Sequence, residues 1–139
     1  MRKENFYKYD TEAKQYANAM SDLAEFNCGA EIRTFYKIKP HVASRKAESL
    51  SRRRDIQAVL VSLENDRDDT DIFTSTPTVN HMHLAIQGTN VTTENLAKGL
   101  FVSPKEIHLK KIKNKRERVG YCLKEMNLND GHHDIFISN

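Results

Sequence analysis

The hydrophobic and polar positions along the chain follow a helical period in some stretches and a strand alternation in others. Apolar side chains recur every three or four positions over residues 11–26, which predicts a helix that Asn27-Cys28-Gly29 brings to an end. Over residues 30–39 apolar and charged side chains alternate, as in a half-buried strand. The run IQAVLVSL over residues 56–63 is apolar and rich in β-branched side chains, which is typical of a central strand.

The same patterns predict further elements in the rest of the chain. They are a polar surface helix over residues 41–54, strands over 79–87 and 107–112, a helix that opens at Thr92 or Thr93 and stops before Ser103-Pro104, a helix over 114–126, and a segment, 134–138, compatible with a short last strand. From residue 30 the order is βαββαβα, which predicts an α+β, ferredoxin-like fold. We expect a mostly antiparallel sheet of about five strands, helices packed mainly on one face, and an extra N-terminal helix.

The composition fits a single globular domain over residues 1–139. Hydrophobic residues make up 38% of the chain and charged residues 29%. No apolar run approaches the ~18 residues of a membrane span, and the N-terminus has no apolar region typical of a signal peptide. Cys28 and Cys122 stand far apart without a C-x-x-C spacing, which indicates reduced thiols and a cytoplasmic location.

The charges are grouped in blocks, although the net charge is only +3. Arg52, Arg53 and Arg54 follow one another, residues 55–71 carry six acidic side chains, and residues 105–118 carry seven basic ones. Such blocks are often plain solvated surface. Two basic blocks on either side of an acidic block also suit a groove for a polyanion around a cation site.

The motif His81-Met82-His83 is the first candidate for chemistry. Side chains alternate along a strand, so both histidines face the same side and can bind one divalent ion through nitrogen. The alternative is a pair of polar histidines on an exposed face. A carboxylate from a neighbouring strand would complete a metal site. Glu64, at the end of the preceding strand, is the first choice, and Asp71 in the acidic loop is the reserve.

Tyr121 is the next candidate, because Lys124 follows it three residues later on the same face of a predicted helix. A phenol has a pKa near ~10 and is a poor nucleophile until a cation polarises its target or stabilises the phenolate. A metal ion and a nearby ammonium group could supply that help. Taken alone, the pair is better described as a half-buried packing tyrosine beside a surface lysine.

Together, these features resemble the HUH endonuclease superfamily, and within it the nuclease domain of rolling-circle replication initiators. His81-Met82-His83 matches the histidine–hydrophobic–histidine motif, and Tyr121 with Lys124 matches a Y-x-x-K motif. Tyr121 follows His83 by 38 positions, which leaves room for one helix, one strand and the start of the next helix. The order and spacing of these motifs carry the resemblance, since each motif alone is short.

The resemblance covers residues 30–127 and leaves the N-terminal helix outside. The first family motif, an aromatic-rich first strand, falls loosely on Thr34-Phe35-Tyr36. The third metal ligand has no motif of its own here, so Glu64 is inferred by position. No G-x-x-x-x-G-K-[ST] sequence occurs, so the helicase domain that many viral initiators carry is not expected.

The resemblance implies a metal-dependent endonuclease and strand transferase acting on single-stranded or hairpin origin DNA. Tyr121 would attack the scissile phosphate and form a 5′-phosphotyrosine link, with Lys124 stabilising the developing charge. A Mn²⁺ or Mg²⁺ ion on His81, His83 and an acid would polarise the phosphate. The implied partners are the host replication machinery and a separate helicase, and a single nucleophile leaves a homodimer open. The side chains expected to hold the DNA backbone are Arg52, Arg53, Arg54, Lys110, Lys111, Lys113, Lys115 and Arg116.

Three other functions compete with this one. Single-tyrosine transposases of the same superfamily share the histidine pair, but they usually carry tryptophan-containing motifs, and the chain has no Trp. A non-catalytic, ferredoxin-like nucleic-acid-binding module is the second, although the predicted strands lack a clear aromatic pair for base stacking. A small cytosolic protein whose histidines have no function is the third.

Overall fold

The structure is a computed structural model, and it describes residues 15, 18–34, 36–65, 80–112, 114–122 and 132–138. In chain order the elements are β1 (Cys28–Arg33), α3 (Pro40–Ser51), β2 (Ile56–Asn65), β3 (Asn80–Gly88), α4 (Thr93–Leu100), the 3-10 turn η2 (Pro104–Glu106), β4 (Ile107–Lys111), α5 (Lys115–Cys122) and β5 (His132–Ile137). The strands form one sheet in the order β4-β1-β3-β2-β5, and each neighbouring pair is antiparallel. The predicted α+β class with a five-stranded antiparallel sheet is confirmed.

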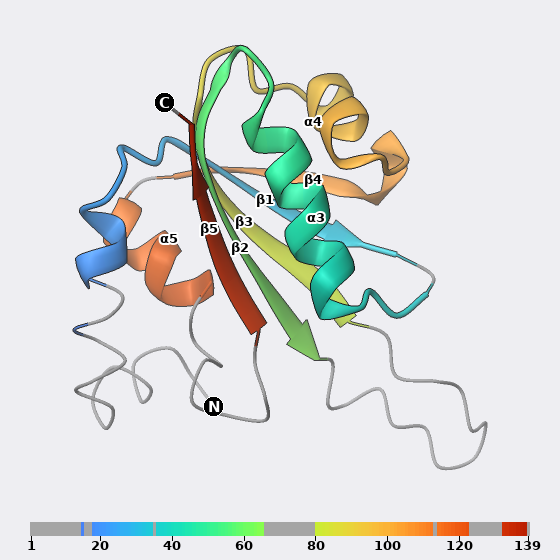
Figure 1. The fold of residues 1–139 in the computed structure, drawn as a ribbon, viewed down its shortest axis with the longest axis horizontal. Helices are drawn as coiled ribbons and strands as arrows, with labels where there is room; N and C mark the ends of the chain where they lie inside the picture. The colour runs from blue at the N-terminus through green and yellow to red at the C-terminus, as the bar shows by residue number, and fades with distance from the viewer. Residues whose placement is uncertain are drawn as a thin grey trace.

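Helices pack on both faces of this sheet (Figure 1). On one face, apolar side chains of α3 and α4 join those of the strands in the larger core. On the other face, Val119 and Cys122 of α5 form a second cluster with Ala58, Leu60 and Ala85. The expectation that helices lie mainly on one face holds for α3 and α4, whereas α5 packs on the opposite face.

β2 is a central strand because both of its faces carry apolar side chains. Val59 and Val61 belong to the core under α3 and α4, while Ala58 and Leu60 belong to the cluster under α5. All four side chains are fully buried. The apolar run over residues 56–63 therefore predicts this strand correctly. β2 continues beyond the run by two polar residues, Glu64 and Asn65.

The ends of α3 and α4 follow local sequence signals. Pro40 stands in the first turn of α3, where a missing backbone N–H leaves no helical hydrogen bond unmade. Thr92 caps α4, and its hydroxyl accepts a hydrogen bond from the Asn95 backbone N–H at 3.1 Å. Phe101 caps the C-terminal end of α4, and its φ of 56° lies in the left-handed region.

The predicted helix over residues 11–26 is too long at its C-terminal end. Among the described residues the helix stops at Ser21. The backbone N–H groups of Asp22 and Leu23 donate to carbonyls three residues earlier, which tightens and closes the last turn. Phe26 lies beyond the helix and contributes to the cluster under α5.

The predicted strand over residues 30–39 is displaced towards the N-terminus in β1. The Asn27 backbone N–H donates to the Ile86 carbonyl at 2.8 Å and brings the chain to β3. Two of the three residues expected to end the preceding helix are therefore strand residues. Beyond the end of β1, the Thr34 hydroxyl donates to the Tyr36 carbonyl at 2.5 Å, a local bond that competes with sheet pairing.

Two expectations near the C-terminus have different outcomes. β5 confirms the short last strand expected over residues 134–138 and pairs with β2. The helix expected over residues 114–126 corresponds to α5, and the part of that expectation from residue 123 onwards lies outside the described residues. Residues 66–79, which contain most of the predicted acidic loop, also lie outside them. None of the helices described is long and apolar enough to cross a membrane.

Candidate metal centre

His81 and His83 lie side by side on β3, on the face of the sheet that α5 covers. They share this face with Ala85, which packs in the cluster under α5. Their ring centroids are 4.6 Å apart, with the rings edge to face at 74°. The residues are only 4% and 1% exposed. The alternative of two polar histidines on an exposed face is therefore wrong.

Glu64 reaches the histidine pair from β2. It stands opposite His81 in the ladder between β2 and β3. Its Oε2 accepts a hydrogen bond from His83 Nε2 at 2.5 Å and lies 3.3 Å from His81 Nε2. The first-choice carboxylate thus lies against both imidazoles. The reserve choice, Asp71, falls outside the described residues.

A second carboxylate, Glu31, approaches the histidines from β1 on the opposite side. It stands opposite His83 in the ladder between β1 and β3, and its Oε1 is 3.4 Å from His81 Nε2. Glu31, His81 and His83 each have one ligand atom within 4.8 Å of those of the other two. Together they form a buried cluster that could hold a metal ion. Glu31 was not among the predicted ligands. The available signal is its place on the polar side of an alternating strand, which becomes informative once that strand is paired with the histidine strand.

The surroundings of the cluster also fit a polar ligand. Ser62 stands opposite His83 on β2, and its hydroxyl is buried with no hydrogen-bond partner among the residues described. Leaving such a group unpaired costs about 1–3 kcal/mol, so a buried hydroxyl of this kind usually has a partner. Two imidazoles and two carboxylates make a suitable ligand set for a divalent cation. The residues present therefore fit a divalent ion. A water molecule bound to such an ion would give the Ser62 hydroxyl a hydrogen-bond partner.

Burial and charge shift the protonation of the cluster in favour of metal binding. Burial lowers the pKa of His83, and the hydrogen bond and charge of Glu64 only partly offset it, so the imidazole is held neutral. Burial opposes ionisation of Glu31 most strongly, but the positive charge near it, which includes that of Arg33, and the hydrogen bond from Arg33 together outweigh the burial and hold its pKa below the usual value. Neutral imidazole and ionised carboxylate are the forms that bind metal ions.

Two cations border the cluster on the β1–β4 side. Arg33 Nη2 donates to Glu31 Oε1 at 2.6 Å, and Lys110 Nζ lies 3.5 Å from Glu31 Oε2. Lys110, one of the side chains predicted to contact DNA, is thus brought to the candidate metal centre. Arg33 was not predicted, because it stands alone in the sequence rather than in a basic block.

Arg118 attaches α5 to the sheet beside this cluster. Its Nη2 donates to the carbonyls of Ala30 at 2.8 Å and Leu84 at 3.1 Å, and its Nε donates to Leu84 at 3.2 Å. Gly29 allows the approach, because a Cβ at this position would lie 2.7 Å from Arg118 Nε. This member of the basic block therefore binds the protein's own strands.

The predicted nucleophile, Tyr121, lies in the last turn of α5, three residues after Arg118. Its helix packs on the same face of the sheet as the histidines. The side chain of Tyr121 and all of Lys124 lie outside the described part of the structure. The proposed pairing of the two side chains therefore stays a prediction.

The remaining basic side chains of the block near α5 are placed differently from one another. Lys115 Nζ lies 3.1 Å from Glu25 Oε1, and Arg116 Nη2 lies 2.8 Å from Asp22 Oδ1, so both tie α5 to the segment after the N-terminal helix. Lys111 is exposed on the edge strand β4. Lys113 lies outside the described residues.

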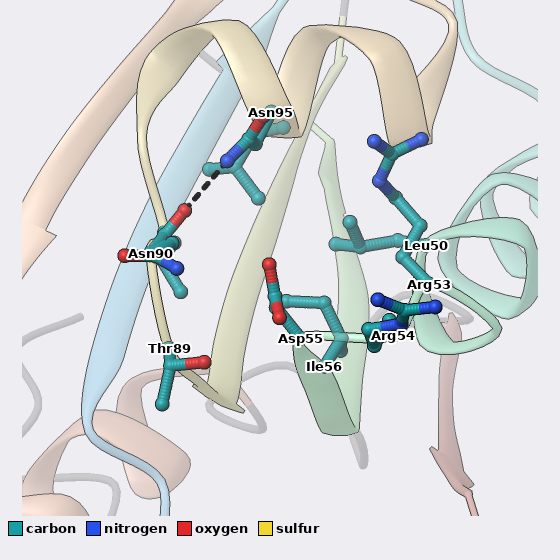
Figure 2. A pocket seen from close by; sticks show the side chains of 10 residues that line it. Leu50, Arg53, Arg54, Asp55, Ile56, Thr89, Asn90 and Asn95 are labelled. Atoms are coloured by element: carbon teal, nitrogen blue, oxygen red, sulfur yellow. Dashed lines mark hydrogen bonds between the residues drawn. The ribbon is translucent and has the colours of Figure 1, made fainter.

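The arginine run lies at the other end of the sheet from the histidines. Arg53 and Arg54 line a cavity of about 290 Å³ together with Asp55, between the end of α3 and the loop before α4 (Figure 2). Arg52 instead lies 3.5 Å from Glu48 one turn earlier in α3. The strand β2 starts beside this cavity and reaches Glu64 eight residues later, which is about 26 Å along an extended strand. The fold does not bring the arginine run to the candidate metal centre.

The chain matches no protein-family model, and comparisons with curated proteins and with solved structures likewise found no match.

Proposed function

We propose that the protein is a metal-dependent DNA nicking and joining enzyme of the HUH type, with Tyr121 as its nucleophile. The observation that carries the proposal is the meeting of two imidazoles from β3 with Glu64 from β2, at 2.5 and 3.3 Å, on the face that also carries α5. A helix on this face brings its last turn, which contains Tyr121, to the metal side of the sheet. The substrate is single-stranded or hairpin DNA at a replication origin, and the cut starts rolling-circle replication of a plasmid or virus.

The chain's own residues account for the binding steps of this reaction. His81, His83 and Glu64 hold a divalent ion, for which we propose Mn²⁺ or Mg²⁺, and Glu31 is available as a further ligand. The ion supplies Lewis-acid polarisation of the scissile phosphate. Lys110 and other exposed cations of the sheet edge hold the DNA backbone through its phosphates.

The covalent step is an in-line exchange at phosphorus. The Tyr121 phenol oxygen forms a bond to the phosphorus while the bond from phosphorus to the 3′-oxygen breaks. The phenol proton passes to water or a base, and the departing 3′-oxygen takes up a proton to become a hydroxyl. The products are a 5′-phosphotyrosine and a free 3′-hydroxyl that primes synthesis. Lys124 stabilises the charge that develops at the phenolate or the phosphoryl oxygens.

The proposed reaction also requires partners. Replication from the nicked origin needs a helicase to unwind the duplex, together with the host replication machinery in the cytoplasm. With one tyrosine nucleophile per chain, rejoining needs either a second protomer in a homodimer or a second nicking event.

The test is a denaturation-resistant adduct between the protein and labelled single-stranded hairpin DNA from its own replicon in the presence of Mn²⁺. Tyr121→Phe and His81→Ala should each abolish the adduct, and so should chelation of the ion. Tyr36→Phe is the matched control, because Tyr36 is exposed and follows β1 rather than lying on α5. An adduct that survives Tyr121→Phe would refute the nucleophile. DNA binding without any adduct would favour the non-catalytic module.

A further inference from the structure

Glu31 is shared between the histidines and two cations. Its Oε1 lies 2.6 Å from Arg33 Nη2 and 3.4 Å from His81 Nε2. Its other oxygen, Oε2, lies 3.5 Å from Lys110 Nζ. A single carboxylate therefore contacts both the candidate metal centre and the cations beside it.

The two cations lie at the solvent side of this arrangement. The side chain of Glu31 is only 9% exposed, whereas those of Arg33 and Lys110 are 55% and 48% exposed. Arg33 follows Glu31 by two residues on the same face of β1, and Lys110 comes from the edge strand β4. A guanidinium carries five N–H donors and an ammonium three, so both groups can bind further acceptors.

We propose that Arg33 and Lys110 form a phosphate-binding pair for the DNA backbone, and that Glu31 couples this pair to the metal centre. The inference rests on the proposed metal-dependent function. A divalent ion that takes Glu31 as a ligand competes with the guanidinium and the ammonium for the same two oxygens. When the metal ion binds Glu31, the N–H groups of Arg33 and Lys110 become free to donate to a phosphate. Phosphate oxygens accept such hydrogen bonds with a geometry similar to that of a carboxylate.

Thermodynamic linkage gives this arrangement a measurable consequence. If the ion strengthens DNA binding by some factor, DNA must strengthen ion binding by the same factor. Such coupling commonly amounts to about 5–150-fold in affinity. The competing interpretation is that Arg33 and Lys110 only neutralise a buried carboxylate, in which case their removal leaves DNA affinity nearly unchanged.

The experiment measures binding rather than catalysis. Tyr121→Phe protein, which does not cleave, is titrated with a labelled single-stranded oligonucleotide by fluorescence anisotropy, once with Mn²⁺ and once with EDTA. Mn²⁺ should tighten binding about 10-fold, within the usual range of coupling. Adding Arg33→Ala and Lys110→Ala should remove most of that gain in affinity. The two substitutions should also reduce the slope of log affinity against log salt by the contribution of about two phosphate contacts. Inorganic phosphate in excess distinguishes a general anion site from one that needs a DNA strand.

Glu31→Gln and Glu64→Gln make a matched pair for the coupling. Each removes one negative charge from the same cluster, but Arg33 and Lys110 pair with Glu31. Glu31→Gln should therefore tighten DNA binding in EDTA and abolish the effect of Mn²⁺, whereas Glu64→Gln should leave binding in EDTA nearly unchanged. Thermal unfolding of both variants in EDTA checks that each is folded.

The failures of the two proposals are distinguishable. Equal tightening by Glu31→Gln and Glu64→Gln would overturn the coupling, since net charge alone would then explain it. Full DNA affinity in the Arg33→Ala, Lys110→Ala protein, or displacement of the oligonucleotide by inorganic phosphate alone, would overturn the DNA phosphate pair. Calorimetry with Mn²⁺ alone tests the metal centre separately, and a chain that binds no ion there refutes the proposed function itself.

Discussion

The guanidinium of Arg118 lies directly over Gly29, so close that a Cβ at position 29 would stand 2.7 Å from Arg118 Nε. From this place the guanidinium donates to backbone carbonyls of both β1 and β3. Tyr121 follows three residues later in α5. Gly29 thus leaves room for the side chain that attaches α5, the helix of the proposed nucleophile, to the sheet.

Gly29→Ala should lower the free energy of unfolding by about 1–3 kcal/mol, because the new methyl group displaces Arg118 from its two carbonyl partners. Urea unfolding followed by circular dichroism measures the effect. In an Arg118→Ala background the same substitution should cost much less, since the displaced group is absent. An equal cost in both backgrounds would show that Arg118 is not what the methyl group disturbs.

Mn²⁺ should stabilise the folded protein by binding at the candidate metal centre. At a free concentration about 100-fold above Kd, one site raises the free energy of unfolding by about 2.7 kcal/mol. Replacing His81 and His83 together by alanine should remove this increase. His41→Ala serves as the control, because His41 is exposed on α3. Equal stabilisation of the two variants would mean that the ion binds elsewhere.

The periodicity of the sequence is enough to predict the histidine pair and Glu64, but not Glu31. Alternation along one strand places His81 and His83 on one face, and Glu64 lies near the end of the strand that precedes them in the sequence. The contact of Glu31 with the histidines depends on β1 pairing with β3, some 50 positions away. Such a long-range pairing follows from the whole fold rather than from local pattern.

The charges were the least predictive feature of the sequence. Arg118 and Arg116 belong to the same basic block, yet one binds strand carbonyls and the other pairs with Asp22. A block of like charge in the sequence does not indicate which group each side chain will contact. The partner of a long side chain depends on which backbone carbonyl or carboxylate the fold brings near it. For the same reason Arg33, a lone cation in the sequence, becomes part of the site.

Substitutions in the basic block should therefore have unequal effects on DNA binding. Lys110→Ala should reduce the slope of log affinity against log salt by about 1, because it removes one proposed phosphate contact. Arg116→Ala should leave that slope unchanged, since Arg116 is engaged with Asp22, and should cost only about 0.2–1 kcal/mol of stability. Salt titrations of oligonucleotide binding make the comparison, and a lower slope for Arg116→Ala would place that side chain on the DNA instead.

Acid should destabilise the metal-free protein from near neutral pH. Burial lowers the pKa of His83, against the effect of Glu64, and burial and His132 lower the pKa of His133, against the effect of Asp134. The unfolded chain takes up these protons near the ordinary histidine value of 6.5, whereas the folded chain takes them up only at lower pH. The contribution of these histidines to stability is therefore fully present above pH 6.5 and is lost as the pH falls below it. For the buried His83 the loss is at most about 1.4 kcal/mol per pH unit, and it is smaller for the half-buried His133.

Unfolding in EDTA at a series of pH values measures this loss. His133→Gln should make the decline shallower, because glutamine binds no proton. A free energy of unfolding that stays constant from neutral pH to well below 6.5 would contradict the burial of these imidazoles in the folded state.

The most direct test of the proposed chemistry is to locate the DNA on the chain. The Mn²⁺-dependent adduct is digested with nuclease and protease, and the peptides are sequenced by mass spectrometry. We predict a nucleotide joined through a 5′-phosphate to Tyr121, in a peptide that is absent from the His81→Ala protein. A nucleotide on any other residue, or no modified peptide under conditions where Mn²⁺ and DNA are both bound, would contradict the account.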